Sequence, residues 1–221
     1  MEIDKHYINQ IEVVTNIFTV ENGRIKVLLF RKIEEPFRGY WMLPSILLMT
    51  SETIEECASD TIYQFVGLRD LYLKQSKIFS KIDRLPGARI LANSLICLVD
   101  FDTIMYNQNK KESSESDWFD INEIPKMIYD HGTILESAVN DLRSLLVNDY
   151  DMIKILYPKD FTLPELQLTY EHLLNKKLDR RNFRKKLINL NILEDTMDKN
   201  NKTNGRPAKL YCFKDNLEGS F

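Results

Sequence analysis

The sequence predicts an α+β protein in two parts: a mixed α/β domain in the N-terminal half and a small basic domain near the C-terminus. The chain has 221 residues, of which 43% are hydrophobic, so it can bury a sizeable core. Strand-like and helix-like patterns alternate up to about residue 130. Residues 175–214 hold 12 Lys or Arg and four Asp or Glu, a local charge of +8, although the net charge of the chain is −3. This polarity is typical of a polyanion-binding module joined to an acidic domain.

The first elements are predicted to be a β-hairpin and an amphipathic helix. Residues 11–33 contain two β-rich runs, and Asn22-Gly23 between them favours the tight turn of a hairpin. Apolar residues then recur at helical spacing between Ser51 and Gly67. We expect Ser51 to cap this helix and Gly67 to end it.

Two longer strands, a short strand and a helical segment are predicted to complete the first domain. Pro86-Gly87 supplies the turn between the longer strands, and a polar stretch at 107–116 precedes the short one. We place the first domain at residues 1–132. The expected elements lie at residues 71–82, 88–101, 118–119 and 124–129.

A longer helix is predicted to connect the two domains. Thr133 and Glu136 have the spacing of a capping box, which would start the helix. Its apolar positions recur with helical periodicity, so it can pack against a domain or a second subunit. We place this connector at residues 133–149, with Leu135, Ala138, Leu142, Leu145 and Leu146 on its apolar face.

Residues 150–221 are predicted to form a winged helix-turn-helix. Thr162 and Glu165 give a second capping box, which starts a helix that runs to about residue 174. Asp179 can cap the next helix, which has one apolar face and is otherwise basic. Two short strands around a loop then form the wing: the strands are expected at 192–196 and 209–213, and the loop contains Asn204-Gly205-Arg206-Pro207.

The second helix of this motif suits DNA, because it can bury an apolar stripe while it presents long donors to bases and phosphates. Arg181 and Arg184 carry planar guanidinium groups and are our candidates for base reading, whereas the lysines suit phosphate contacts that weaken as salt rises. The alternatives are a solvated basic helix and a winged helix that binds protein. The predicted DNA-binding residues are Thr162, Arg180, Arg181, Asn182, Arg184, Lys185, Lys186, Lys202, Arg206 and Lys209.

Several other functional classes leave no pattern in the sequence. There is no run of about 18 apolar residues, and the N-terminus carries acids where a secretory signal needs basic and apolar residues. We therefore expect a cytoplasmic protein with no membrane partner. Cys57, Cys97 and Cys212 lack C-x-x-C spacing, and no histidine has a second ligand at i+4. We expect these cysteines and histidines to be structural, with no metal site and no cofactor.

Particular segments also match a known family. They are Arg31-Lys32, Glu35-Pro36-Phe37, Gly39, Trp41, Leu43-Pro44, Trp118, Ile124-Pro125, Asp130-His131, residues 161–167, 170–171 and 179–186, Gly205–Ala208 and Tyr211. Together they resemble the Nudix-related transcriptional regulators, the NrtR family, over nearly the whole chain. The resemblance implies an α/β/α sandwich of the Nudix type followed by a winged helix.

The Nudix signature itself is degenerate. A Nudix hydrolase needs the pattern G-x5-E-x7-R-E-U-x-E-E-x-G-U, whose helix carboxylates hold magnesium against a diphosphate. When the pattern is aligned so that it ends at Gly67-Leu68, Glu52 and Ile62 are retained. The remaining positions have lost their signature residues and hold Ile46, Asp60, Thr61, Gln64 and Phe65. We therefore expect that the chain is not an enzyme.

The resemblance implies that the Nudix-like domain senses a small molecule. Family members respond to ADP-ribose or to a sugar such as L-arabinose, and the missing diphosphate and magnesium residues favour a neutral sugar. Sugar or nucleotide recognition needs polar donors and an aromatic face. Our effector candidates are Arg38, Trp41, Glu52, Asp83 and Arg84, with the alternatives that Trp41 is a core residue and that Asp83 and Arg84 form an ion pair in the turn.

The resemblance also implies a homodimeric repressor on a palindromic double-stranded operator, where two half-sites reinforce each other. Two other functions stay open. One is a metal-dependent hydrolase of nucleoside diphosphate compounds. The other is a ligand-free scaffold whose cleft is filled by Ile46 and Phe65.

Overall fold

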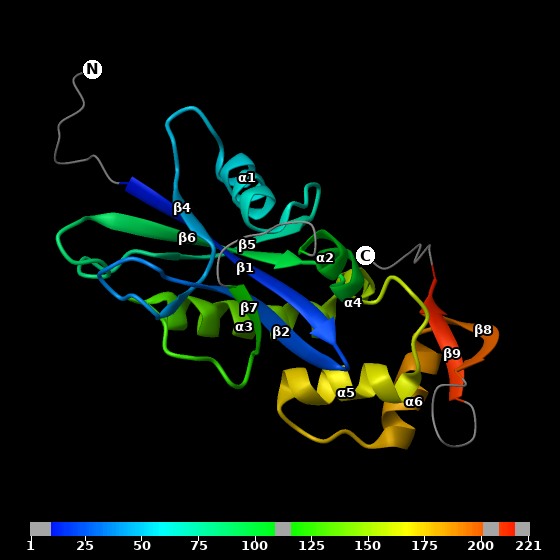
Figure 1. Cartoon of the computed structure of the whole chain (residues 1–221). Coiled ribbons are helices and arrows are strands. Elements are labelled where there is room, and N and C mark those ends of the chain that lie inside the picture. Colours follow the sequence, from blue (N-terminus) through cyan, green and yellow to red (C-terminus); the bar gives the residue numbers. More distant parts are fainter. Residues whose placement is uncertain (1–9, 109–115, 201–207, 215–221) are drawn as a thin grey trace.

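The computed structural model describes residues 10–108, 116–200 and 208–214. The centre of its larger part is a mixed sheet of seven strands (Figure 1). They are β1 (Gln10–Glu21), β2 (Arg24–Arg31), β3 (Trp41–Met42), β4 (Ser45–Leu47), β5 (Tyr72–Phe79), β6 (Ile90–Leu98) and β7 (Ser116–Asp120). The main path is β3-β2-β1-β6-β5, with β4 paired to β1 and β7 paired to β2. Helices α1 (Ile54–Val66) and α3 (His131–Asn148) cover opposite faces.

Strand β1 is buried on both faces, because it lies in the middle of the sheet between β2 and β6. Val14 and Phe18 belong to the cluster that contains the apolar face of α3, whereas Val13 and Ile17 belong to clusters on the α1 side. This alternation follows from the two-residue period of a strand. The predicted α/β/α sandwich is confirmed.

The first hairpin is confirmed. Its turn residues Asn22 and Gly23 have φ angles of 51° and 74°. Both angles lie in the left-handed region, which asparagine and glycine tolerate best. The turn therefore joins β1 and β2 in antiparallel register, with Glu21 opposite Arg24.

Helix α1 is present, but the prediction of its cap was wrong. Thr53 caps the helix: its side chain accepts a hydrogen bond from the backbone of Glu56, and the Glu56 carboxylate accepts one from the Thr53 backbone. This reciprocal arrangement is a capping box, and it leaves Ser51 outside the helix. The predicted end is confirmed, because Gly67 has a φ of 76° at the C-cap.

Two predictions for the second half of this domain were also wrong. The strand expected to reach Phe101 ends at Leu98, and helix α2 (Phe101–Gln108) follows. Residues 124–129 form no helix. Their backbone pairs with β3 instead: the Trp41 N–H donates to the Lys126 carbonyl, and the Ile128 N–H donates to the Trp41 carbonyl. Tertiary hydrogen bonds thus replace the local helical ones.

Helix α3 begins earlier than its predicted capping box. It starts at His131, and Asp130 at the N-cap makes no side-chain cap hydrogen bond. Thr133 therefore lies inside the first turn and does not cap the helix. A tertiary contact fixes this end: His131 Nδ1 accepts a hydrogen bond from the Leu43 N–H at 3.1 Å.

The C-terminal part is the predicted winged helix-turn-helix. Helix α4 (Tyr150–Leu156), which we did not predict, precedes α5 (Leu163–Leu174) and α6 (Arg180–Asn189). The wing consists of β8 (Leu193–Asn200) and β9 (Ala208–Phe213). The capping box at Thr162 and the cap at Asp179 are both confirmed.

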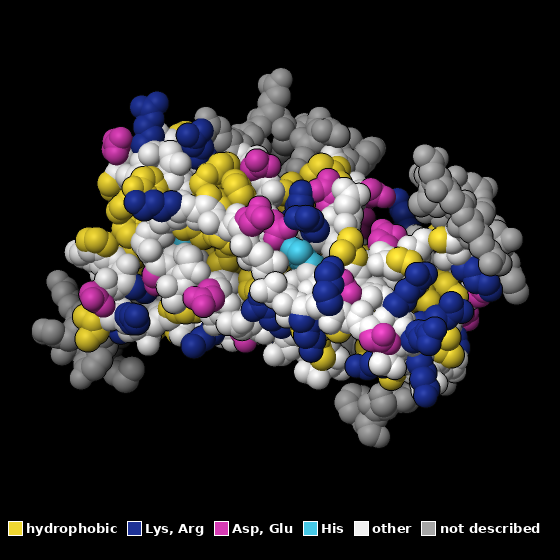
Figure 2. Space-filling model, turned by 90° about the horizontal axis from the view of Figure 1, so that it is seen from below, with side chains coloured by type: hydrophobic (Ala, Val, Ile, Leu, Met, Phe, Trp, Pro, Cys, Tyr) yellow, Lys and Arg dark blue, Asp and Glu magenta, His cyan; other side chains and the backbone are white. Residues whose placement is uncertain are grey.

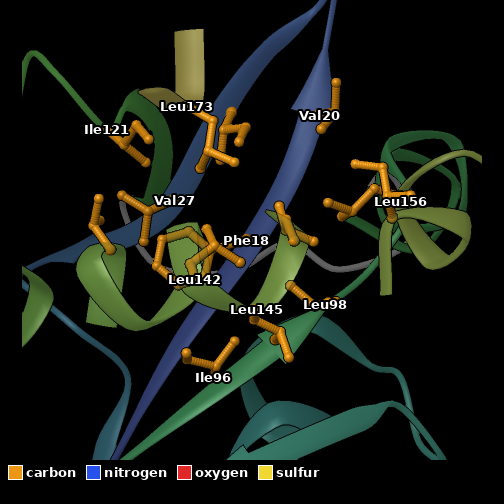
Figure 3. Packing of buried hydrophobic residues seen from close by; sticks show 14 of the residues in the cluster. Phe18, Val20, Val27, Ile96, Leu98, Ile121, Leu142, Leu145, Leu156 and Leu173 are labelled. Atoms are coloured by element: carbon orange, nitrogen blue, oxygen red, sulfur yellow. The ribbon is translucent and has the colours of Figure 1, made fainter. Parts of the chain in front are cut away.

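A single hydrophobic cluster runs from the sheet into the winged helix. It contains Phe18 and Val27 of the sheet, Leu142 of α3 and Leu173 of α5, which Figure 3 shows together. Leu187 of α6 belongs to the same cluster. The domain limits 1–132, 133–149 and 150–221 stay predictions, because buried packing is continuous across them. No helix in the described ranges is both long and apolar enough to cross a membrane.

Candidate nucleic-acid interface

The two helices of the helix-turn-helix are held by specific local signals. The Thr162 hydroxyl accepts from the Glu165 N–H at 3.3 Å, which fixes the start of α5. Asn175 ends α5 with a left-handed φ of 49°. Asp179 Oδ1 then accepts from the Asn182 N–H at 2.8 Å and starts α6. The sequence therefore sets both ends of the turn locally.

Side chains of α5 clamp the turn itself. The Glu171 carboxylate accepts the Leu178 N–H at 2.9 Å, and Gln167 donates to the Leu178 carbonyl at 2.9 Å. Lys177 adds an ion pair to Glu171 at 3.0 Å. The Leu178 N–H, with Gln167 and Lys177, lowers the pKa of Glu171 to about 2, so this carboxylate is charged at neutral pH. Our sequence reasoning missed both clamp residues, because their partner lies across the turn.

Helix α6 divides into a buried and an exposed face. Leu187 is buried, and the Phe183 ring packs against Tyr170 of α5 with centroids 5.7 Å apart. The exposed face carries the cations predicted to contact DNA. They are Arg180, Arg181, Arg184, Lys185 and Lys186, all exposed, with Asn182 exposed beside them. Figure 2 shows Lys and Arg side chains gathered over this end of the molecule.

The wing is tied to the start of α5. Phe161 and Tyr211 exchange two backbone hydrogen bonds, at 2.9 and 2.8 Å, so the segment before α5 pairs with β9. Lys209 on β9 forms an ion pair with Asp195 on β8 at 2.5 Å, and Asp195 raises the pKa of Lys209. Lys209 keeps 59% of its side chain exposed, so it can still reach a phosphate. Lys202 and Arg206 lie outside the described residues.

A pocket of about 140 Å³ lies where α5, α6 and the wing meet. Arg180 and Arg184 line it from α6, Lys209 from β9 and Pro164 from α5. Three cations from two elements therefore converge at this notch. Such an arrangement attracts an anionic backbone and does not by itself read a base.

Two effector candidates share the β2–β3 connection. Arg38 is exposed in this loop, and Trp41 lies half-buried at its end. The Trp41 ring meets Phe119 of β7 edge-on, with centroids 4.6 Å apart. Trp41 therefore links the loop to the sheet.

Aromatic residues beside Arg38 were not among our candidates. The Phe37 ring lies 5.8 Å from Tyr40 and 4.8 Å from Tyr129, measured between centroids. Phe37 and Tyr129 have φ angles of 74° and 41°, which bulky residues rarely adopt. The only signal in the sequence was the density of aromatic residues.

Arg84 occupies a buried position within the domain. Its guanidinium contacts Glu12 at 2.9 Å and Asp130 at 2.9 and 3.0 Å, and the side chain is fully enclosed. It pairs with these two acids, whereas Asp83 beside it is exposed. Glu52 is half-buried and accepts the Met49 N–H at 2.8 Å. Arg38 and Trp41 therefore lie on one segment, whereas Arg84 forms buried ion pairs elsewhere in the domain.

The residues at the Nudix signature positions of α1 do not fit a magnesium site. Thr61 is buried and donates its hydroxyl to the Cys57 carbonyl at 2.7 Å. Phe65 packs against Phe30 with centroids 4.3 Å apart, and Asp60 pairs with Arg69 at 2.9 Å. Across the described ranges, no group of three or more His, Cys, Asp or Glu is arranged to hold a metal. Magnesium requires several oxygen ligands in near-octahedral geometry, which this set does not supply.

Comparison with known proteins finds similarities that cover both parts of the chain. A model of the NrtR DNA-binding winged helix domain matches residues 155–213. An ADPR responsive transcriptional repressor, NtrR, from Acinetobacter baylyi is 29% identical over 202 residues, which is 89% of this chain and 79% of the relative.

Solved structures agree with this relation. NrtR of Shewanella oneidensis in complex with a 27mer DNA is 25% identical and superposes with a TM-score of 0.77, covering 92% of this chain and 93% of its own. The NUDIX domain of the same protein, in complex with ADP ribose, has a TM-score of 0.53 at 19% identity and covers 63% of this chain and 94% of its own. This second likeness shows the fold of the front domain.

Proposed function

We propose, on the premise that the chain belongs to the NrtR family of Nudix-related transcriptional regulators, that it is a DNA-binding repressor controlled by ADP-ribose. One observation carries the DNA-binding part: the exposed face of α6 presents five cations from a helix-turn-helix whose ends and turn are all fixed by hydrogen bonds. A positioned, basic recognition helix is what major-groove binding requires. Operator symmetry then favours a homodimer, as in other helix-turn-helix regulators.

Support for ADP-ribose as the effector comes from the two relatives whose names include it. The loop with Arg38 and Trp41 offers chemistry that suits this ligand, since a cation can meet phosphates and aromatic rings can stack on a base or sugar. A neutral sugar such as L-arabinose, which we favoured from the sequence, finds no support in the comparisons. We therefore propose binding of ADP-ribose without its hydrolysis.

Operator binding is tested by selecting bound fragments from genomic DNA and measuring their affinity by fluorescence anisotropy at several salt concentrations. We expect affinity to fall steeply as salt rises, because phosphate contacts release counterions. Addition of ADP-ribose should change the operator affinity. A protein that ignores all DNA at low ionic strength would contradict the proposal.

Base reading is tested with Arg184→Ala. If the Arg184 guanidinium reads a base, its removal should weaken binding to the selected site by about 1–3 kcal/mol. It should also relax the sequence preference at one base pair. A loss that is equal on all sequences would assign Arg184 to phosphate. Arg69→Ala is the matched control, because Arg69 is exposed on the front domain and pairs there with Asp60.

The competing activity is metal-dependent hydrolysis. Incubation of the protein with ADP-ribose and magnesium should release no AMP, because Thr61, Gln64 and Phe65 occupy positions that hold glutamates in active enzymes. Release of AMP at a rate proportional to protein concentration would establish the hydrolase instead.

A further inference from the structure

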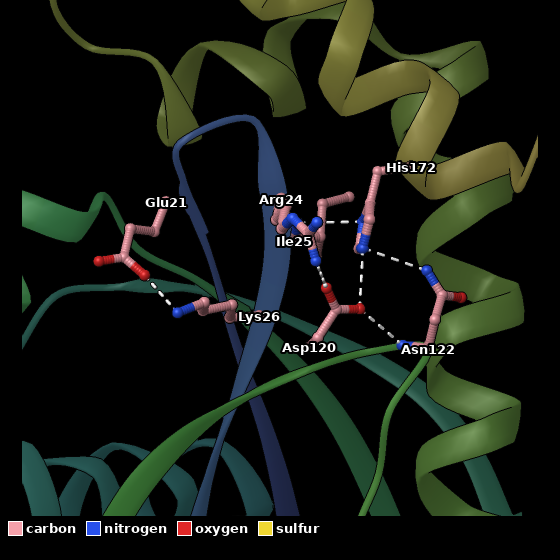
Figure 4. Close-up of polar contacts among 7 residues, drawn as sticks. All are labelled: Glu21, Arg24, Ile25, Lys26, Asp120, Asn122 and His172. Atoms are coloured by element: carbon pink, nitrogen blue, oxygen red, sulfur yellow. Dashed lines mark hydrogen bonds and ion pairs between the residues drawn. The ribbon is translucent and has the colours of Figure 1, made fainter. Parts of the chain in front are cut away.

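The first helix of the helix-turn-helix, α5, is joined to the front domain by a half-buried histidine, His172 (Figure 4). Its Nδ1 accepts the Ile25 N–H of β2 at 3.2 Å. Its Nε2 lies 2.8 Å from Asp120 Oδ1 at the end of β7 and 3.1 Å from Asn122 Nδ2. The side chains of His172 and Asp120 are each only 11% exposed. One imidazole therefore contacts two strands of the sheet from the second domain.

The hydrogen bond to Ile25 determines which ring nitrogen of His172 carries the proton. Because Nδ1 accepts a hydrogen bond, the ring proton is on Nε2, which donates to Asp120. Asp120 also accepts the Asn122 N–H at 2.9 Å and pairs with Arg24 at 3.2 Å. Burial raises the pKa of Asp120, but Asn122, His172 and Arg24 together outweigh burial and lower it. The bond to His172 is thus charge-assisted and stronger than a neutral one.

Asp120 and Ile25, two of the front-domain partners of His172, connect to the candidate effector region. Asp120 directly follows Phe119, whose ring packs against Trp41. Ile25 belongs to β2, whose far end pairs with β3 through Arg31 and Trp41. A ligand that moves Trp41 would therefore act on the two strands that hold His172.

On the other side, His172 is adjacent to the turn of the helix-turn-helix. The preceding residue, Glu171, holds the Leu178 N–H in that turn. One helical turn earlier, Leu168 packs against Gly23 of the first hairpin so closely that a Cβ at Gly23 would lie 2.7 Å from it. Contacts one turn apart fix the rotation of α5 about its axis relative to the sheet.

We propose that Asp120 and His172 are positioning residues that transmit effector occupancy from the front domain to the recognition helix. This inference rests on the proposed function, since it assigns a structural route to the regulation of operator binding by ADP-ribose. The pair acts through the orientation of α5 and does not touch DNA. Such coupling requires two arrangements of the contact that the effector populates differently.

The experiment measures operator affinity with and without ADP-ribose for the full chain and for Asp120→Ala, His172→Phe and the double variant. The quantity of interest is the fold-change in operator affinity that ADP-ribose causes. We expect this fold-change to be at least about fivefold smaller in each single variant than in the unsubstituted chain. In the double variant it should be reduced no further than in either single variant. Asp120→Asn keeps an acceptor oxygen and should fold and retain an intermediate response. The affinity for ADP-ribose without DNA, measured by calorimetry, should stay within about threefold of the unsubstituted chain.

Lys159 and Asp102 provide the matched control. They form a second ion pair between the winged helix and the front domain, at 2.6 Å, but both side chains are about 70% exposed, at 72% and 67%. Lys159→Ala should leave the response to ADP-ribose unchanged, because an exposed pair contributes little.

The outcomes separate the two proposals. A full response to ADP-ribose in Asp120→Ala and His172→Phe, even with weakened operator binding, would show a merely structural role and overturn the inference while the proposed function stands. If ADP-ribose does not change the operator affinity of the unsubstituted chain, both fail. Loss of the response in Lys159→Ala would also refute the specific role of the pair formed by His172 and Asp120.

Discussion

At the scale of single residues, Arg84 shows how one guanidinium holds together distant parts of the front domain. Its partners are Glu12 on β1 and Asp130 before α3, and the Arg84 side chain is fully enclosed. Removing one member of a buried ionic group leaves the other charges uncompensated. The position therefore serves the fold, and an effector would have to displace an existing partner to bind there.

Arg84→Ala should lower the free energy of unfolding by about 3–5 kcal/mol, because Glu12 and Asp130 lose their counter-ion. Urea denaturation followed by circular dichroism would measure this. Arg69→Ala removes an exposed pair and should cost less than about 1 kcal/mol. Equal losses in the two variants would contradict the structural importance of the buried group.

Glu12 makes the same group sensitive to acid. Burial raises the pKa of Glu12, but His131, Ser45 and Arg84 outweigh this effect and lower it from 4.5 to about 2. A depressed pKa means that the contribution to stability is fully present above about pH 4.5 and is lost as the pH falls towards about 2.

We therefore expect the free energy of unfolding of the unsubstituted chain to exceed that of Glu12→Gln by about 3 kcal/mol near pH 6. This difference should shrink as the pH falls from about 4.5 to 2. Urea titrations at a series of pH values would measure the difference. Glu55→Gln, exposed on α1, is the control and should show a much smaller one. A difference that is independent of pH would show that Glu12 acts only through packing.

At the scale of elements, the first hairpin and α5 fit together through one glycine. Gly23 has a φ of 74°, and a Cβ there would lie 2.7 Å from the Leu168 side chain. Gly87 has nearly the same φ, 75°, but has nothing within 4 Å of its missing Cβ. Substitutions at the two glycines therefore distinguish the cost of backbone strain from the cost of crowding at the interface.

Gly87→Ala should cost about 1–2 kcal/mol, because an alanine side chain disfavours the left-handed region. Gly23→Ala should cost a further 1–3 kcal/mol or so, because it also overpacks against Leu168. The free energies of unfolding of the two variants give the comparison. Adding Leu168→Ala should recover the extra loss in Gly23→Ala, and a double variant no more stable than Gly23→Ala would contradict the contact.

Local signals in the sequence were sufficient for some elements and insufficient for others. Thr162 with Glu165 forms a capping box as predicted, whereas the same spacing at Thr133 and Glu136 does not. The difference is tertiary, because the contact of His131 with Leu43 fixes the helix start two residues earlier. Residues 124–129 likewise pair with Trp41 in place of forming a helix.

The candidate sites also contain features that local sequence signals could predict and features that they could not. The cations of α6 could be predicted, because their exposure depends on the spacing of apolar residues within one helix. The contact of His172 with Asp120 joins residues 52 positions apart. No local pattern encodes it, since it depends on how α5 is packed against the sheet. The ion pairs of Arg84 could not be predicted for the same reason, because its partners Glu12 and Asp130 are distant in the sequence.

At the scale of the whole molecule, the chain is divided by charge but continuous in its core. The excess of positive charge lies in the C-terminal part, where residues 175–214 carry +8. The buried cluster, however, extends from Phe18 in the sheet through Leu173 of α5 to Leu187 of α6. Under the proposed function, the DNA-binding end shares its core with the sensor and can respond to changes in it, because packed interiors transmit displacement.

This continuity predicts that the two parts unfold together. Both tryptophans, Trp41 and Trp118, lie in the front domain, so their fluorescence reports on that part alone. Leu187→Ala, in α6, should destabilise the chain by about 2–5 kcal/mol and shift the fluorescence midpoint in urea as far as the midpoint of far-UV circular dichroism. Ile188→Ala is the control, because Ile188 is 56% exposed and should shift neither. An unmoved fluorescence midpoint with a two-step dichroism curve would show that the winged helix unfolds independently of the sheet.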